Sequence, residues 1–199
     1  MMITLWIVAI GGYFLGAIPS GFLIAKYAKG IDIRRHGSGN PGAANVYRTC
    51  GKIPGFATAI GDILKGFLPV YLAVSIEPEL TWFHLLVGAL AIIGHNWTVF
   101  LGFKGGKGVA TSAGVCVCLL PIPTLCATGA FLLGAALTNH ISVGSMLAAV
   151  VLPATSLALG SPPSLAIMSV IIGAVILIRH ISNMKRLLTG RELLFAKKT

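Results

Sequence analysis

Long apolar runs recur along the whole chain and leave few positions for charge. They cover residues 3–24, 53–76, 80–94, 109–137, 141–160 and 164–178. A helix that crosses a bilayer needs about 20 predominantly apolar residues in succession. Only 10% of the 199 residues are charged, whereas a soluble domain carries about 25%. We therefore expect an all-α, polytopic membrane protein, with residues 1–199 forming a single domain.

The basic residues indicate which ends of these runs share one side of the membrane. All 15 Lys and Arg except Lys65 lie in three segments, residues 26–52, 104–107 and 179–198. Positively charged loops stay in the cytoplasm, so the three segments are expected on the inner face. Basic residues follow the first run instead of preceding it, which is the opposite of a signal peptide. The first run is therefore expected to be a retained span with its N-terminus outside.

Charge also limits the number of spans. Between the second and third basic segments the chain must cross the membrane an even number of times, yet three apolar runs lie there. The run 109–137 contains Pro121-Ile122-Pro123, and proline interrupts a helix because it lacks an N–H and clashes with the preceding turn. Splitting the run there gives a bundle of seven transmembrane helices, N-terminus out and C-terminus in, with the three basic segments on the cytoplasmic face. Because both halves are short, a partly re-entrant arrangement is the alternative.

The first basic segment, RRHGSGNPGAANVYR at residues 34–48, combines charge with glycine. Glycines let successive backbone N–H groups turn toward an anion. Ser38 and Asn45 add neutral hydrogen bonds, and Arg48 adds a planar guanidinium suited to phosphate. The alternative is a loop whose charges only fix topology. The glycine, serine and asparagine content exceeds what that role needs, so we favour an anion site.

The second segment, HNWTVFLGFKGGKGVATSAG at residues 95–114, places two lysines and four glycines within residues 102–108. It is not a Walker A loop, because Lys107 is followed by glycine instead of Ser or Thr. A helix is expected to begin near Val109, with Thr111 in its first turn. A helix N-terminus, free backbone N–H groups and ammonium groups together favour phosphate. Lysines that only set topology are the alternative.

The third segment, RHISNMKRLLTGRE at residues 179–192, reads as an amphipathic helix on the inner surface. In a helix His180, Asn183 and Arg186 share one face, since residues three apart are neighbours. Either this face serves the site or the segment is an ordinary basic interfacial helix.

Polar residues within or beside the spans complete the candidate site. Asp62 and Lys65 are three residues apart and are expected to pair on one helix face. His95 is expected to orient the glycine-rich segment, and Ser142, in the short connection 138–142, is placed to reach the same site. The cysteines show no metal-binding or CxxC spacing, so neither a metal nor a disulfide is expected.

Taken together, the three segments resemble those of one family, the small integral-membrane glycerol-3-phosphate acyltransferases of bacteria that use acyl phosphate. The resemblance rests on GSGNPG with Asn45 and Arg48, on Gly94-His95 with FKGGKGVAT, and on Arg179-His180 with Asn183, Arg186-Leu187-Leu188, Gly190 and Glu192. It runs nearly end to end and includes Asp62, Lys65 and Gly66. Two departures are Ala44, where Thr is usual, and Thr98, where Pro is usual.

The resemblance implies a role for each segment. Catalytic roles are expected for Ser38, Arg48, His180 and Asn183. Substrate contacts, with glycerol 3-phosphate in the glycine-rich loop, are expected from Gly37, Gly39, Asn40, Gly42, Asn45, Lys104, Gly105, Gly106, Lys107, Gly108, Thr111, Ser142 and Arg186. Structural support is expected from His95, Glu192, Asp62 and Lys65.

The implied reaction is transfer of a fatty acyl group from acyl phosphate to the 1-hydroxyl of glycerol 3-phosphate, which gives lysophosphatidic acid and phosphate. The expected partners are these two substrates and the lipid bilayer of the bacterial inner membrane, with no nucleic acid and no cofactor. The chain has no GxSxG and no His followed four residues later by Asp, so direct transfer without an acyl-enzyme is expected. The base is either His180 or a substrate phosphate. A phosphate transporter, the rival interpretation, would place its polar groups near the midplane.

Overall fold

The computed structural model describes residues 2–195, and within them the regular elements are all helical. Lys197 and Lys198, which the charge argument includes, lie outside the described residues. The chain divides into two compact units, Met1–Cys118 and Leu119–Thr199. Each unit carries part of the predicted site.

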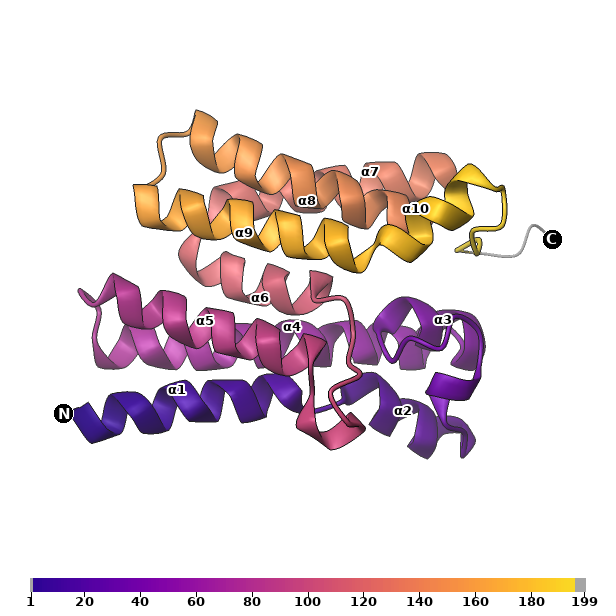
Figure 1. Cartoon of the computed structure of the whole chain (residues 1–199), viewed down its shortest axis with the longest axis horizontal. Coiled ribbons are helices and arrows are strands. Elements are labelled where there is room, and N and C mark those ends of the chain that lie inside the picture. The colour runs from indigo at the N-terminus through magenta and orange to yellow at the C-terminus, as the bar shows by residue number, and fades with distance from the viewer. Residues whose placement is uncertain (1, 196–199) are drawn as a thin grey trace. The chain divides into compact units, whose positions relative to one another are not determined.

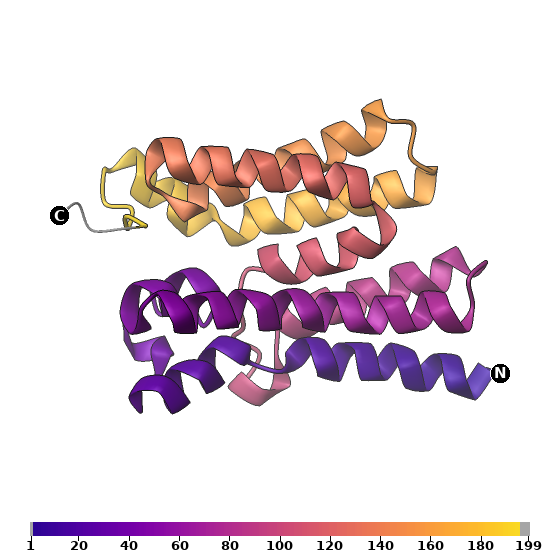
Figure 2. The same cartoon turned by 180° about the vertical axis from the view of Figure 1, so that it is seen from behind.

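The first unit contains a bundle of long helices with shorter ones at one end (Figures 1 and 2). Its elements are α1 (Met2–Ala17), α2 (Ser20–Lys29), η1 (Ile33–Arg35), α3 (Ala43–Cys50), α4 (Lys52–Ile76), α5 (Thr81–Asn96), η2 (Val99–Leu101) and α6 (Val109–Leu119). The first apolar run, expected to be one membrane span, consists of α1 and α2, which together form one candidate span, Met2–Lys29. Pro19 lies at the break, where it cannot supply a helical N–H.

Glycines let the long helices of this unit approach closely. A Cβ at Gly12 would lie 3.2 Å from Cγ1 of Val87, and one at Gly16 would collide with the backbone of Ala91, so both glycines face α5. Gly94 of α5 in turn lies against the carbonyl of Tyr13. Small residues spaced four apart allow such close helix packing within a membrane. Because α1 and α5 run in the same direction, their starts lie at the end of the bundle opposite the glycine-rich segment (Figure 1).

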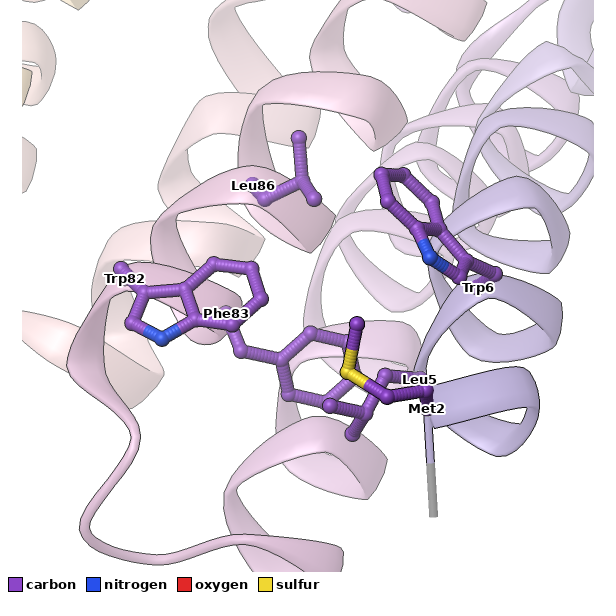
Figure 3. Close-up of a pocket in the computed structure, with 6 residues that line it drawn as sticks. All are labelled: Met2, Leu5, Trp6, Trp82, Phe83 and Leu86. Atoms are coloured by element: carbon purple, nitrogen blue, oxygen red, sulfur yellow. The ribbon is translucent and has the colours of Figure 1, made fainter.

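The starts of α1 and α5 enclose an apolar pocket (Figure 3). Its lining consists of Met2, Leu5, Trp6, Trp82, Phe83 and Leu86. Trp6 and Trp82 remain about half exposed, at 55% and 53%. Tryptophan is enriched where a membrane meets water, so this end of the unit has the character of a membrane interface, away from the polar segments.

The second unit consists of α7 (Pro121–Thr138), α8 (Ile141–Ala158), α9 (Pro163–Arg179) and α10 (Ile181–Leu188). Gly144 of α8 lies against the backbone of Phe131 on α7, and Gly173 of α9 lies against the carbonyl of Ala149 on α8. These contacts explain the tight antiparallel arrangement of the three long helices. The amphipathic helix predicted from residues 179–192 is present as α10.

Five helical stretches are long and apolar enough to cross a membrane, and α9 with α10 forms a possible sixth, bent by 52°. The predicted break in the run 109–137 is confirmed, because α6 ends at Leu119 and α7 begins at Pro121. The 11 residues of α6 extend about 16 Å, which is shorter than a hydrocarbon core of about 30 Å. The chain is therefore an all-α, multi-pass membrane protein.

Candidate functional site

The loop that carries Ser38 is organised by Asn45, a residue of α3 that is only 1% exposed. Asn45 Oδ1 accepts the backbone N–H of Ser38 at 2.9 Å. Asn45 Nδ2 donates to the carbonyls of His36 at 2.9 Å and Asn40 at 3.0 Å. We predicted that Asn45 contacts substrate. The structure shows that its amide holds the loop backbone, so Asn45 shapes the loop; its contact with substrate stays a prediction.

Glycine is required where this loop meets Asn45. Gly37 and Gly39 have φ angles of +58° and +71°, a region that other residues rarely adopt. A Cβ at Gly37 would also collide with Asn45 Oδ1. The loop leaves Ser38 exposed at its tip.

Arg48 lies on α3, three residues after Asn45 and hence on the same face of that helix. The first basic segment therefore contains both a loop, which carries Ser38, and a helix, which carries Arg48. Helix α3 fixes its backbone, while the carboxamide of Asn45 fixes the loop that bears Ser38. Asn45 thus holds the loop that bears Ser38, and Arg48 belongs to the same helix as Asn45.

Asp32 stabilises the approach to this loop, a role that the sequence interpretation missed. Its carboxylate accepts the Arg34 backbone N–H at 3.0 Å, which begins η1, and pairs with Arg34 Nη2 at 2.7 Å. The guanidinium of Arg34 also lies 5.1 Å from the ring centre of Phe22. The hydrogen bond from Arg34 lowers the pKa of Asp32 to about 2. An acidic residue two positions before an arginine was the available signal in the sequence.

The glycine-rich loop, residues 102–108, folds back onto the last turn of α5. The N–H groups of Gly105 and Gly106 donate to the carbonyls of Asn96 at 3.1 Å and His95 at 3.0 Å. A Cβ at Gly106 would collide with the imidazole of His95. Glycine is therefore needed here for close packing, and the predicted link between His95 and the loop is present.

The loop leads directly into α6, which begins at Val109 as expected. Gly108 has a φ of +87°, and its carbonyl accepts the Ser112 N–H at 2.7 Å. The hydroxyls of Thr111 and Ser112 are buried, and among the described residues they have no hydrogen-bond partner. Buried hydroxyls normally have partners. Two such groups in the first turn of a helix, where the helix dipole favours anions, fit a polar ligand.

A buried ion pair lies beneath this loop. Lys65 Nζ is 2.8 Å from Asp62 Oδ1, as predicted, and Asp62 Oδ1 is 3.6 Å from His95 Nδ1. Both charged side chains are almost fully buried. A buried charge is tolerated when it is paired and hydrogen-bonded, so these residues connect α4 with the end of α5 that carries the loop.

The second unit contains its own polar cluster, centred on the carboxylate of Glu192. Oε1 accepts from Ser142 Oγ at 2.8 Å and from Asn183 Nδ2 at 2.6 Å, while Oε2 accepts from Arg186 Nε at 2.7 Å. Burial alone would raise the pKa of Glu192, but the hydrogen bonds from Arg186, Asn183 and Ser142 outweigh it and lower the pKa below the ordinary value.

Two predicted substrate contacts are part of this cluster. Ser142 was expected in a connection but lies in the first turn of α8, where its hydroxyl proton is used by Glu192. Ser142 therefore supports Glu192, and its contact with substrate stays a prediction. Arg186 belongs to the cluster through Nε. No pattern in the sequence indicates that residues 142 and 192, fifty positions apart, meet.

His180 lies at the start of α10 and is 4% exposed. Its Nδ1 is 2.8 Å from the carbonyl of Ile176. A carbonyl can only accept a hydrogen bond, so Nδ1 carries the proton in the neutral ring and Nε2 carries the lone pair. This tautomer suits a general base acting through Nε2.

The chain is similar to known proteins over most of its length. Residues 6–190 match a family model described as glycerol-3-phosphate acyltransferase. A glycerol-3-phosphate acyltransferase of Trichlorobacter lovleyi is 48% identical over 185 residues, covering 92% of this chain and 93% of that protein. One from Geobacter sulfurreducens is 44% identical over 180 residues, covering 90% and 92%.

Solved structures agree with the sequence relatives. A crystal structure of PlsY (YgiH), an integral membrane glycerol 3-phosphate acyltransferase, in its glycerol 3-phosphate form has a TM-score of 0.92 and 39% identity, covering 97% of this chain and 96% of that one. The lysophosphatidic acid form of PlsY has a TM-score of 0.89 and 38% identity over the same shares.

Proposed function

Because the chain belongs to the glycerol-3-phosphate acyltransferase family, we propose that it transfers a fatty acyl group from acyl phosphate to the 1-hydroxyl of glycerol 3-phosphate. The products are lysophosphatidic acid and inorganic phosphate, in the first acylation step of phospholipid synthesis. The observation that supports this proposal is the presence of two glycine-rich segments that each carry a cation, Arg48 in the first and Lys104 with Lys107 in the second. Two substrates that both bear phosphate account for two such segments.

The glycine-rich loop is assigned to the phosphate of glycerol 3-phosphate. Lys104 and Lys107 supply positive charge, and the first turn of α6 supplies backbone N–H groups with the helix dipole. The buried hydroxyls of Thr111 and Ser112 add donors that no described residue uses. The loop is supported by the buried cluster of His95, Asp62 and Lys65.

The loop at residues 37–42 is assigned to the acyl phosphate. Ser38 donates a hydrogen bond to the leaving phosphate or to the acyl carbonyl oxygen, and Arg48 neutralises the charge that develops on the leaving phosphate. Gly37, Gly39, Asn40 and Gly42 shape the loop around that group. Neither Ser38 nor Arg48 forms a covalent intermediate.

The reaction then proceeds in one transfer. The 1-hydroxyl oxygen attacks the carbonyl carbon, a new C–O bond forms, and the bond from that carbon to the phosphate oxygen breaks with its electron pair on phosphate. The hydroxyl proton passes to His180 Nε2 or to a substrate phosphate. Since acyl phosphate is already activated, positioning and charge stabilisation supply most of the rate. Asn183, held by Glu192, supports His180 from the same helix.

The topology belongs to the same proposal. Residues 1–199 act as a single domain of seven transmembrane helices, with the short α6 as the seventh. The N-terminus lies outside, the C-terminus inside, and the catalytic face meets the cytoplasm at the bacterial inner membrane. The basic segments at one end of the first unit and the apolar pocket with Trp6 and Trp82 at the other support this orientation.

A phosphate-release assay tests the donor. Purified protein with acyl phosphate should release phosphate only when glycerol 3-phosphate is added, and lysophosphatidic acid should appear in equal amount. Acyl-CoA and acyl carrier protein with the same chain serve as the alternative donors. Equal or faster transfer from either thioester would contradict acyl phosphate as the donor, and phosphate release without acceptor would indicate a hydrolase.

A further inference from the structure

At the break between α1 and α2, two backbone carbonyls accept hydrogen bonds from side chains in distant parts of the first unit. At the break, Thr98 Oγ1 donates to the carbonyl of Ala17 at 2.6 Å, and Lys65 Nζ donates to the carbonyl of Ile18 at 2.7 Å. A carbonyl at a helix end needs a partner when it is buried. Here the partners come from α4 and from the segment that follows α5.

Thr98 also builds the turn that begins the glycine-rich loop. The residue is 2% exposed. Its hydroxyl accepts the Phe100 N–H at 3.2 Å, and its carbonyl accepts the N–H groups of Leu101 at 3.2 Å and Phe103 at 2.8 Å. Thr98 thus makes hydrogen bonds at both the start and the end of η2. Its hydroxyl also donates to α1 and so links the turn to that helix.

The turn ends in an unfavourable backbone conformation just before the first loop lysine. Gly102 has a φ of +62°, and Phe103 has a φ of +61°. A residue with a side chain persists in this region only where surrounding contacts hold it. For Phe103 the described contact is its N–H bond to Thr98. Lys104 follows directly, so the direction in which it leaves the turn depends on Thr98.

We propose that Thr98 is a positioning residue for the glycine-rich loop, tying it through the Ala17 carbonyl to the break in the first apolar run. The proposal rests on the proposed function, in which Lys104 contacts the phosphate of glycerol 3-phosphate. Thr98 itself touches no substrate in this scheme. Its hydroxyl limits the positions that Lys104 and the following glycines adopt, and the loop is therefore pre-organised for its anion.

Three variants test this role in the full-length protein. Thr98→Val keeps the shape and removes the hydroxyl, and Thr98→Ser restores the hydroxyl. The matched control is Thr124→Val, because Thr124 of α7 is also buried and its hydroxyl donates a bond of similar length, 2.7 Å, to the carbonyl of Leu120, the N-cap of α7. The readouts are KM for each substrate, kcat, and hydrogen exchange of the Phe100 and Phe103 amides.

Loss of one hydrogen bond should raise KM for glycerol 3-phosphate about 3- to 10-fold in Thr98→Val. KM for acyl phosphate and kcat should change far less, exchange at Phe103 should become faster, and Thr98→Ser should resemble the wild type. Thr124→Val should alter neither KM nor exchange at these amides. Thr98→Ala takes the place of the valine variant if that variant does not fold.

Unchanged KM and unchanged exchange in Thr98→Val would overturn the proposal, as would an equal rise in KM for both substrates. Failure of Thr98→Ser to restore the wild-type values would also overturn it. The exchange measurement separates this idea from the proposed function. If the wild type does not acylate glycerol 3-phosphate, the proposed function fails, while faster exchange at Phe103 still supports the tie between Thr98 and the turn.

Discussion

Arg48 differs from the lysines of the site because its planar guanidinium presents several donors in a fixed geometry. Its backbone is fixed by α3, so the fork is offered from a rigid helix. Arg48→Lys keeps the charge and loses the planar arrangement of donors. We expect the activation free energy to rise by about 2–4 kcal/mol, as for loss of an oxyanion donor, and kcat to fall accordingly. Steady-state turnover by purified protein checks this. Near-normal turnover would remove the fork from the mechanism.

Glu192 concentrates three donors on one carboxylate, so its charge matters for folding. Because its pKa is lowered in the folded state, its contribution to stability is present above the ordinary glutamate pKa and is lost as pH falls through the folded pKa. Melting temperature should therefore drop between about pH 6 and about pH 3 more steeply in the wild type than in Glu192→Gln.

At neutral pH the wild type keeps the full contribution of the Glu192 charge. The Glu192→Gln variant loses it, because glutamine replaces a charged acceptor shared by Arg186, Asn183 and Ser142. That variant should be less stable than the wild type by about 1–3 kcal/mol. Ser145→Ala is a suitable control, since the Ser145 hydroxyl donates to the carbonyl of Ile141 one turn earlier in the same helix. Parallel pH profiles for wild type and Glu192→Gln would contradict the assigned role of the charge.

Among the elements, α4 and α6 meet at a glycine that tolerates no side chain. A Cβ at Gly66 would collide with the carbonyl oxygen of Thr111, in the first turn of α6 beside the glycine-rich loop. Gly66→Ala should therefore displace α6, destabilise the protein by about 1–3 kcal/mol and raise KM for glycerol 3-phosphate. Gly11→Ala is the control, because a Cβ there meets no atom within 4 Å. Equal behaviour of the two variants in thermal unfolding would contradict this account.

Proline illustrates what the sequence predicts about elements and what it does not. The break at Pro121 was predictable because charge parity required an extra turn there. Pro19 also ends a helix, but no charge lies within the first run to indicate it, whereas Pro69 and Pro153 lie inside continuous helices. Packing decides among these cases: the break at Pro19 persists with Thr98 and Lys65 bonded to the carbonyls beside it.

The candidate site was predictable to the extent that its chemistry is local. The cationic and glycine-rich segments, and the Asp62–Lys65 pair, follow from residue type and helical spacing. The dual use of Asn45 by the Ser38 loop and the contact of Ser142 with Glu192 depend on how the chain folds back. Such contacts leave no periodic pattern, so the sequence alone assigned both residues to substrate.

At the scale of the whole molecule, the membrane topology depends on whether α6 crosses the bilayer. If it does, the turn between α8 and α9 lies on the same side as the turn between α4 and α5. If α6 only dips into the bilayer, the second unit is inverted with respect to the membrane. Charge favours the first arrangement, since the basic residues after α9 should share the cytoplasm with those of α2 and α3.

Cysteine labelling distinguishes these two topologies. The four native cysteines are free thiols and are first replaced by serine or alanine. Single cysteines at Glu79, in the turn after α4, and at Ser164, near the start of α9, should react with a membrane-impermeant reagent from outside intact cells. Cysteines at Lys29 and Thr189 should react only after the cells are opened. Labelling of position 189 but not 164 from outside would place α6 as a re-entrant helix and reject the seven-span topology.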